Sequence, residues 1–199
     1  MKNLLLSTML ILTSVLIASI IPTEAEAKIY EDTIRLHILA NSDTEADQAL
    51  KLCIRDKLLT KYGQILSATE TRDEALDEAR ALLPEISADV EAWIRELGYS
   101  YSVTATISEE WYDTRNYGEI SLPSGVYTSL RIIIGSGAGQ NWWCVMYPPL
   151  CLDMATESAP ADDGLINYSK EEITLIKTKK YNVKFKILEL AASAFTKNS

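Results

Sequence analysis

The sequence predicts an α+β domain, in which a small antiparallel sheet has helices packed on one face. Two amphipathic helical segments come early, within residues 42–63 and 71–98. Most of the alternating segments that are typical of strands follow them, within residues 99–147. No internal repeat is present, and the elements are expected to pack as one unit.

The composition excludes several classes of protein. The chain has 199 residues, of which 47% are apolar and 24% charged, with three cysteines. This excludes a disordered, collagen-like or multi-pass membrane protein, and it allows one domain whose core needs no disulfide framework. The net charge is −9. Because such a surface repels phosphate backbones and anionic headgroups, we expect no nucleic-acid partner and no peripheral membrane binding.

Residues 1–27 have the features of an export segment. Lys2 precedes an uncharged run over residues 4–21, and residues 25–27, Ala-Glu-Ala, match the small-x-small pattern of a signal-peptidase site. Cleavage behind this motif would leave residues 28–199 as a single extracytoplasmic domain, with only transient membrane contact. The alternative is an uncleaved signal anchor, since eighteen helical residues span about 27 Å, close to the roughly 30 Å of a bilayer core. Either way, the rest of the protein is expected outside the cytoplasm.

The first strand is expected over residues 29–39, where apolar and polar residues partly alternate. A helix follows it, with a capping box between Ser42 and Glu45 at its start and Gly63 at its end. Its apolar residues recur at helical spacing over residues 46–58.

A second helix is expected to begin at a capping box formed by Thr71 and Glu74 and to end at Gly98. Pro84 lies inside this segment. Because proline lacks a backbone donor and crowds the preceding turn, the sequence predicts either one bent helix or two consecutive ones.

Four strands are expected in the second half of the chain. They cover residues 99–108, 120–122, 126–134 and 142–147. Residues 111–118 are expected to form a loop, and the glycine-rich segment 135–139 is expected to close a hairpin between the last two strands. A dinucleotide phosphate cradle would need a helix after such a glycine-rich loop, whereas a strand follows this one.

The C-terminal part is less regular. Residues 153–164 are rich in Ala, Ser, Pro and acidic residues and are expected to form a surface loop. Ser169 and Glu172 are placed to cap a short helix. Residues 183–195 fit either a strand or a helix, and their alanine-rich end favours a terminal helix.

The single histidine leaves two alternatives open. His37 lies on the first expected strand, and with Cys144 and Asn41 it would make the nucleophile system of an exported thiol hydrolase. A lone histidine on a strand is more often a structural hydrogen-bonding residue. Three cysteines and His37 also equal the ligand count of a structural zinc site, but their spacing lacks a short knuckle, so we expect no metal.

Two cysteines and several aromatic residues are further candidates. Cys144 and Cys151 would close an eight-residue loop, worth about 2 to 3 kcal/mol if unstrained; alternatively both are reduced and buried. Strand alternation places one residue of the Trp142-Trp143 pair inward and the other outward, where it would anchor a partner. A second set of anchors comes from Trp111, Tyr112, Arg115 and Tyr117. These aromatic residues leave a cell-wall binding module open as an alternative function.

Blocks of the sequence match one family pattern in order. Residues 34–43 are Ile-Arg-Leu-His-Ile-Leu-Ala-Asn-Ser-Asp, and the match continues through Asp-Gln-Ala-Leu-Lys-Leu at 47–52 to Arg55-Asp56. The remaining blocks are residues 114–118, 122–125, 130–132, 141–145 and 148–151. In these blocks the chain resembles the stage II sporulation protein R family.

The resemblance implies a signal and not an enzyme, with no cofactor. Members of this family are secreted from the forespore into the space between the forespore and mother-cell membranes. There they activate a membrane-embedded aspartic protease, which processes pro-sigma-E into active sigma-E. This partner is expected for the present chain as well.

The expected partner-binding residues fall in three places. The list is Arg35, His37, Asn41 and Asp43 at the strand-to-helix corner, Arg115 and Tyr117 in the loop, and Trp142, Trp143, Pro148 and Pro149 near the last strand. For Asn41 and Asp43 the alternative is a purely local role in shaping a turn and a helix cap. For Pro148 and Pro149 the alternative is fixing a loop.

Overall fold

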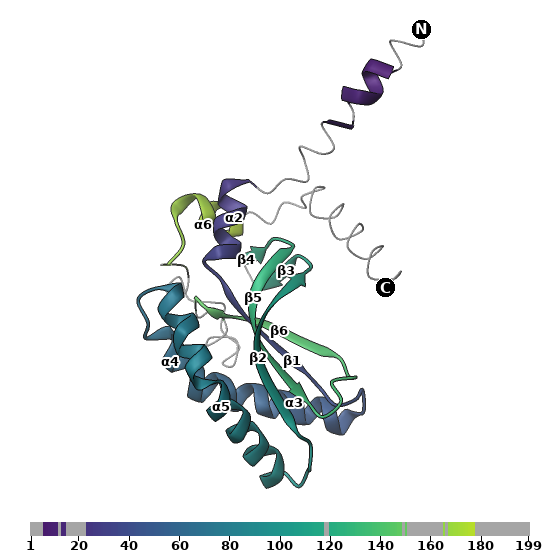
Figure 1. Ribbon diagram of the computed structural model, residues 1–199, viewed down its shortest axis with the longest axis vertical. Helices are drawn as coiled ribbons and strands as arrows, with labels where there is room; N and C mark the ends of the chain where they lie inside the picture. Colours follow the sequence, from purple (N-terminus) through teal and green to yellow (C-terminus); the bar gives the residue numbers. More distant parts are fainter. Residues whose placement is uncertain are drawn as a thin grey trace.

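The computed structural model describes residues 6–11, 13–14, 23–117, 120–148, 150, 165 and 167–177. These residues form a four-stranded sheet, a separate two-stranded hairpin and several helices (Figure 1). The α+β class expected from the sequence is confirmed.

The helices and strands alternate along the chain in blocks. The helices are α2 (Glu24–Glu31), α3 (Glu45–Leu58), α4 (Gln64–Ser67), α5 (Arg72–Glu96) and α6 (Lys170–Lys177). A π-helical turn over Leu59–Gly63 joins α3 to α4. The strands are β1 (Ile34–Leu39), β2 (Val103–Tyr112), β3 (Arg115–Tyr117), β4 (Ile120–Leu122), β5 (Gly125–Ile134) and β6 (Asn141–Tyr147).

The large sheet has the strand order β2-β5-β1-β6, while β3 and β4 pair separately. β1 runs parallel to β5 and antiparallel to β6, and β2 runs antiparallel to β5. The sheet is therefore mixed, and the β1–β5 pair differs from the antiparallel arrangement expected from the sequence. The expected hairpin over residues 135–139 is also wrong, because β1 lies between the two strands that this segment connects.

Backbone contacts explain this order. The amides of Ala138 and Gly139 donate hydrogen bonds to the carbonyls of Asn41 and Ala40, at 3.2 and 2.9 Å. The glycine-rich segment therefore crosses the end of β1 and is held there. Alternation along a sequence does not encode such pairing between distant segments, which is why the hairpin prediction failed.

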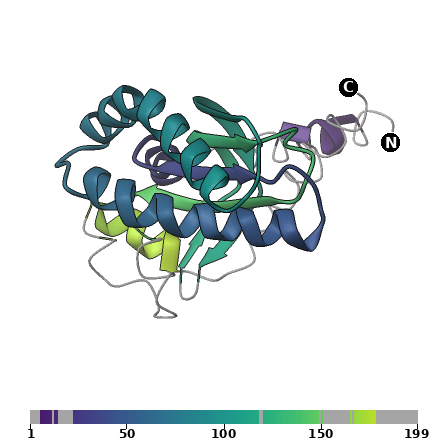
Figure 2. The same ribbon diagram turned by 90° about the horizontal axis from the view of Figure 1, so that it is seen from below.

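The main core lies between the sheet and two helices. α3 and α5 are on the same side of the sheet (Figures 1 and 2). Fully buried side chains come from alternate positions of the two central strands: Ile34, Leu36, Ile38, Leu130, Ile132 and Ile134. In contrast, α2 and α6 pack together beside the β3–β4 hairpin (Figure 1). The expectation of helices on one face thus holds for α3 and α5.

The helix ends partly follow the predictions. α3 is capped by Thr44, whose side chain accepts from the Asp47 amide, so the expected Ser42–Glu45 box is wrong. Gly63 lies within the π-helical turn and does not end the helix. α5 is capped by Thr71, whose side chain accepts from the Glu74 amide, but the Glu74 carboxylate accepts from the Glu70 amide, so only half of the expected box is formed. The helix continues as one helix through Pro84.

The N-terminal part of the domain is helical where a strand was expected. Residues 24–31 form α2, so β1 begins only at Ile34. The predicted cleavage motif at residues 25–27 lies inside α2, and Ile29 from the same helix is fully buried. Within the described part of the chain, no helix has the length and apolar character required to cross a bilayer.

The later elements are also shifted. β2 starts at Val103 and extends to Tyr112, and residues 115–117 form β3, so most of the expected loop 111–118 is strand. The Ser169–Glu172 capping box at the start of α6 is confirmed by two hydrogen bonds. The predictions for residues 153–164 and 183–195 lie outside the described residues.

Candidate functional site

The sheet face opposite α3 and α5 carries polar and aromatic side chains, and we call it the polar face. His37 is at its centre, paired in register with Trp143 on β6 and with Arg131 on β5. Because paired residues on neighbouring strands point to the same side, these three side chains form one row across the sheet.

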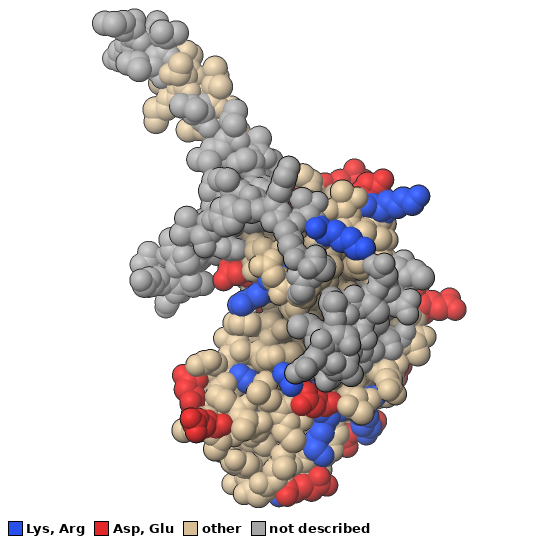
Figure 3. Space-filling view, turned by 180° about the vertical axis from the view of Figure 1, so that it is seen from behind, with Lys and Arg blue, Asp and Glu red and all other residues tan. Residues whose placement is uncertain are grey.

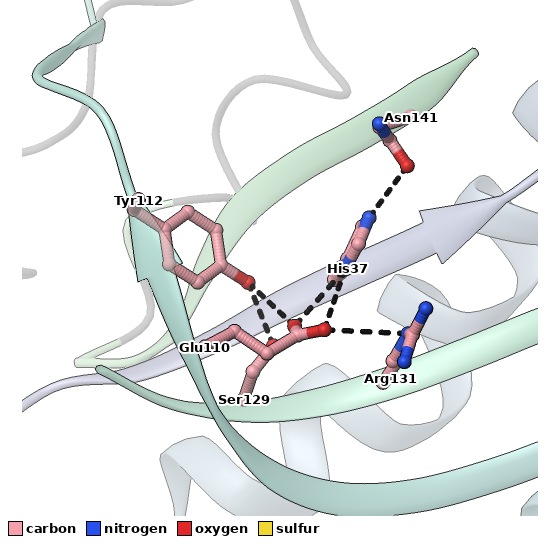
Figure 4. A network of polar contacts seen from close by, with 6 residues as sticks. All are labelled: His37, Glu110, Tyr112, Ser129, Arg131 and Asn141. Carbon is pink, nitrogen blue, oxygen red and sulfur yellow. Dashed lines mark hydrogen bonds and ion pairs between the residues drawn. The ribbon is translucent and has the colours of Figure 1, made fainter. Parts of the chain in front are cut away.

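His37 contacts an oxygen atom at each ring nitrogen (Figure 4). Its Nδ1 lies 3.0 Å from Oε2 of Glu110, and its Nε2 lies 2.8 Å from Oδ1 of Asn141. Both ring nitrogens of His37 are therefore occupied by polar partners within the sheet. His37 is 8% exposed, and its ring is fixed within the sheet by these two contacts.

Glu110 connects this row to neighbouring hydroxyl groups (Figure 4). Its Oε1 lies 3.3 Å from Nε of Arg131, and the Tyr112 hydroxyl donates to its Oε2 at 3.4 Å. Burial disfavours the charged carboxylate, but the hydrogen bond and charge of His37, with Ser129 and Arg131, outweigh burial and lower the pKa of Glu110. Glu110 is therefore an ionised partner of His37.

An aromatic stack extends the row beyond His37. The rings of His37 and Trp143 are stacked with centroids 5.6 Å apart. The guanidinium of Arg115, from β3, lies 4.0 Å from the Trp143 centroid. The indole therefore lies between a histidine and an arginine, and it holds Arg115 at the border of the polar face.

Arg35 lies deeper, beneath the β3–β4 hairpin. It is fully buried, and its guanidinium is 4.1 Å from the Tyr112 ring centroid and 4.8 Å from that of Tyr127. Its Nη2 donates to the Tyr117 hydroxyl at 2.5 Å, and its Nε and Nη1 have no hydrogen-bond partner. Arg35 and Tyr117 are thus interior residues that hold the hairpin onto the sheet.

The corner after β1 has a structural role. Asn41 accepts from the Ser136 amide at 3.0 Å and donates to Asp47 at 2.9 Å. Asp43 accepts from the Gln140 amide at 2.6 Å. Both side chains thereby fix the glycine-rich segment. This agrees with the alternative in which Asn41 and Asp43 have a purely local role. A partner contact of these two residues stays a prediction.

Cys144 does not meet His37. It is paired in register with Leu36, so it points to the helical side of the sheet, and it is fully buried. Cys144 is disulfide-bonded and Cys53 is a free thiol. Cys151 lies outside the described residues, so the predicted pairing remains a prediction. No group of metal-ligating side chains is found among the described residues.

The remaining expected anchors are distributed over the molecule. Trp142 and Trp143 point to opposite faces as predicted, but both are partly buried, and Trp142 lies beneath Arg55 of α3 at 5.2 Å. Pro148 is buried, and Pro149 lies outside the described residues. The cluster therefore brings together His37, Trp143 and Arg115 from the expected set.

Three site residues were missed by the sequence analysis: Glu110, Arg131 and Asn141. Arg131 is the one charged residue in the β-branched run 126–134, and this was a usable signal. Glu110 lay just past the end of an expected strand, so its face was not assigned. Basic and acidic side chains are interspersed on the rear surface (Figure 3).

The fold and the cluster define an α+β domain with a polar, aromatic face, in which the described residues do not bring cysteine and histidine together. The family model of stage II sporulation protein R matches residues 30–157. Stage II sporulation protein R of Bacillus subtilis (strain 168) is 37% identical over 143 residues, which cover 71% of this chain and 64% of that protein. The chain belongs to the stage II sporulation protein R family. No solved structure matches it.

Proposed function

We propose that this protein is a secreted sporulation signal that acts by binding. It would be exported into the space between the forespore and mother-cell membranes and activate a membrane-embedded aspartic protease, which then processes pro-sigma-E. The observation that carries this proposal is the family match over residues 30–157, which includes β1, the β3–β4 hairpin and β6. A non-enzymatic role is part of the proposal.

The geometry of the polar face supports binding more than catalysis. Both ring nitrogens of His37 are held by Glu110 and Asn141, and Cys144 faces the opposite side of the sheet. A thiol hydrolase would need these two side chains within hydrogen-bond distance. Rigid, partly exposed aromatic and arginine side chains, in contrast, are typical anchors of protein interfaces.

Activation would follow from differential affinity. The domain would bind the active arrangement of the protease more tightly than the inactive one and thereby shift its population. Moving such an equilibrium from mostly inactive to mostly active takes about 5.5 kcal/mol. A few anchor residues in a desolvated interface can supply this free energy.

Co-expression tests the proposal. The full chain is produced with the candidate protease and pro-sigma-E, and shortened sigma factor is measured by immunoblot. We expect shortening only when all three proteins are present, with the chain lacking residues 1–27 as the export control. Absence of shortening, with all three proteins produced and the chain exported, would overturn the proposal, as would turnover of a substrate by the purified chain alone.

A further inference from the structure

Arginine pairing differs between the polar face and the rest of the molecule. Four of the seven arginines lie elsewhere, and each is paired with a carboxylate: Arg55 with Asp56, Arg72 with Asp73, Arg80 with Asp77, and Arg95 with Glu91. On the polar face, Arg35 and Arg115 have no ion pair among the described residues. Arg131 shares the carboxylate of Glu110 with His37.

This imbalance is unusual for a chain with 28 acidic and 19 basic residues. Acidic side chains outnumber basic ones, yet among the described residues Glu110 is the one carboxylate paired with any of Arg35, Arg115 and Arg131. An unpaired guanidinium in a partly buried position loses hydration that a bound carboxylate would replace. The excess positive charge therefore marks a place for an anionic group.

The two accessible arginines are held in position for such a group. Arg115 is stacked on Trp143, which in turn is stacked on His37. Arg131 is one strand away from His37 on the other side, and its side chain is 35% exposed. The strands that anchor the two arginines, β5 and β6, are separated by β1. They are therefore about 10 Å apart, which is two strand spacings of roughly 4.8 Å. Arg115, which is held by stacking, loses little additional freedom on binding.

We infer that the polar face binds an acidic segment of a partner protein, whose carboxylates pair with Arg115 and Arg131 beside Trp143. Planar guanidinium groups suit carboxylates because they form two parallel hydrogen bonds. The net charge of −9 opposes long polyanions and anionic membranes, whereas a short acidic segment can meet the cluster locally. The inference rests on the proposed function, since it specifies the chemistry of the receptor surface that this signal contacts.

Binding of a model peptide tests the site directly. The full chain, in mild detergent at low salt, is titrated with hexaglutamate while tryptophan fluorescence is recorded. We expect binding that salt weakens, no binding of hexalysine, and at least a tenfold rise in Kd for the double variant Arg115→Gln, Arg131→Gln. Arg80→Gln and Arg95→Gln remove equal charge on α5 and should leave Kd unchanged. Circular dichroism verifies folding, and Arg115→Lys with Arg131→Lys replaces any variant that fails to fold.

Three results would overturn the inference. These are equal Kd values for the double variant and the α5 controls, equal binding of hexalysine, or tighter binding to phosphatidylglycerol vesicles than to hexaglutamate. Co-expression separates this inference from the proposed function. If the wild-type chain yields no shortened sigma factor, the proposed function fails. If the wild-type chain and the folded double variant activate equally, the inference alone fails.

Discussion

The guanidinium of Arg35 and the hydroxyl of Tyr117 join the central strand of the sheet to the β3–β4 hairpin. Nη2 of Arg35 donates to this hydroxyl at 2.5 Å, although 81 residues separate the two in the sequence. Burial raises the pKa of Tyr117, so the hydroxyl stays neutral and accepts this hydrogen bond. The hairpin that carries Arg115 is therefore held onto the sheet through a buried arginine side chain enclosed by tyrosine rings.

Replacing Arg35 should separate the effects of volume and charge. Because no described carboxylate loses a partner, Arg35→Met should change the free energy of unfolding by less than about 1.5 kcal/mol. Arg35→Ala leaves a cavity among Tyr112, Tyr117 and Tyr127 and should cost about 2 to 5 kcal/mol. Urea unfolding measures both. Equal losses for the two variants would show that the charge itself is required.

Asp47 should make stability depend on pH. Hydrogen bonds from Ser42 and Asn41, against the effect of burial, lower the pKa of its carboxyl. A lowered pKa in the folded state means that the carboxylate stabilises the fold above its ordinary pKa of about 3.9. This contribution is lost as pH falls through the lower, folded-state value.

Asp47→Asn should therefore destabilise the domain at neutral pH by about 1 to 3 kcal/mol. It should also reduce the fall in the urea midpoint that the wild-type chain shows between about pH 4 and pH 2, the range in which carboxyl groups become protonated. The control is Asp77→Asn, an exposed carboxylate on α5, which should leave the midpoint almost unchanged. An unaltered pH profile in Asp47→Asn would contradict the assignment.

The disulfide can be checked by counting thiols. We expect iodoacetamide to label one cysteine in the unfolded, unreduced chain, namely Cys53, and three after reduction, by mass spectrometry. Cys151→Ser should expose the Cys144 thiol to labelling and lower the free energy of unfolding by about 2 to 3 kcal/mol. Cys53→Ser serves as the control that leaves the bridge intact. Labelling of all three cysteines without reductant would contradict the pairing.

The N-terminal end of the domain can be tested by truncation. The Thr23 side chain accepts from the Glu26 amide at 3.3 Å, and the Glu26 carboxylate accepts from the Thr23 amide at 2.7 Å. A chain that begins at Lys28 lacks this capping box. It should be about 1 kcal/mol less stable in urea than a chain that begins at Thr23. Equal stability would show that the first turn of α2 is dispensable and that cleavage within it is harmless.

Local signals explain what could be predicted from the sequence. Thr71, Ser169 and Gly98 mark helix ends through their own short-range chemistry, and the structure confirms all three. The strand order could not be predicted, because it depends on which of several apolar strands pairs with β1. The same limit applies to the site. His37 and Trp143 could be chosen from the sequence. Glu110 lies beside them only because of the twist and pairing of β2, which the sequence does not show.

The position of β1 has a consequence for how the polypeptide reaches its final shape. β1 is made first among the strands, yet both of its neighbours, β5 and β6, are made last. A chain that emerges from its N-terminus cannot complete the sheet until Tyr147 has appeared, so β1 waits for both of its partner strands while residues 40–124 are made. Such long-range pairing slows folding, so the sheet of this domain can be completed only after most of the polypeptide has been made.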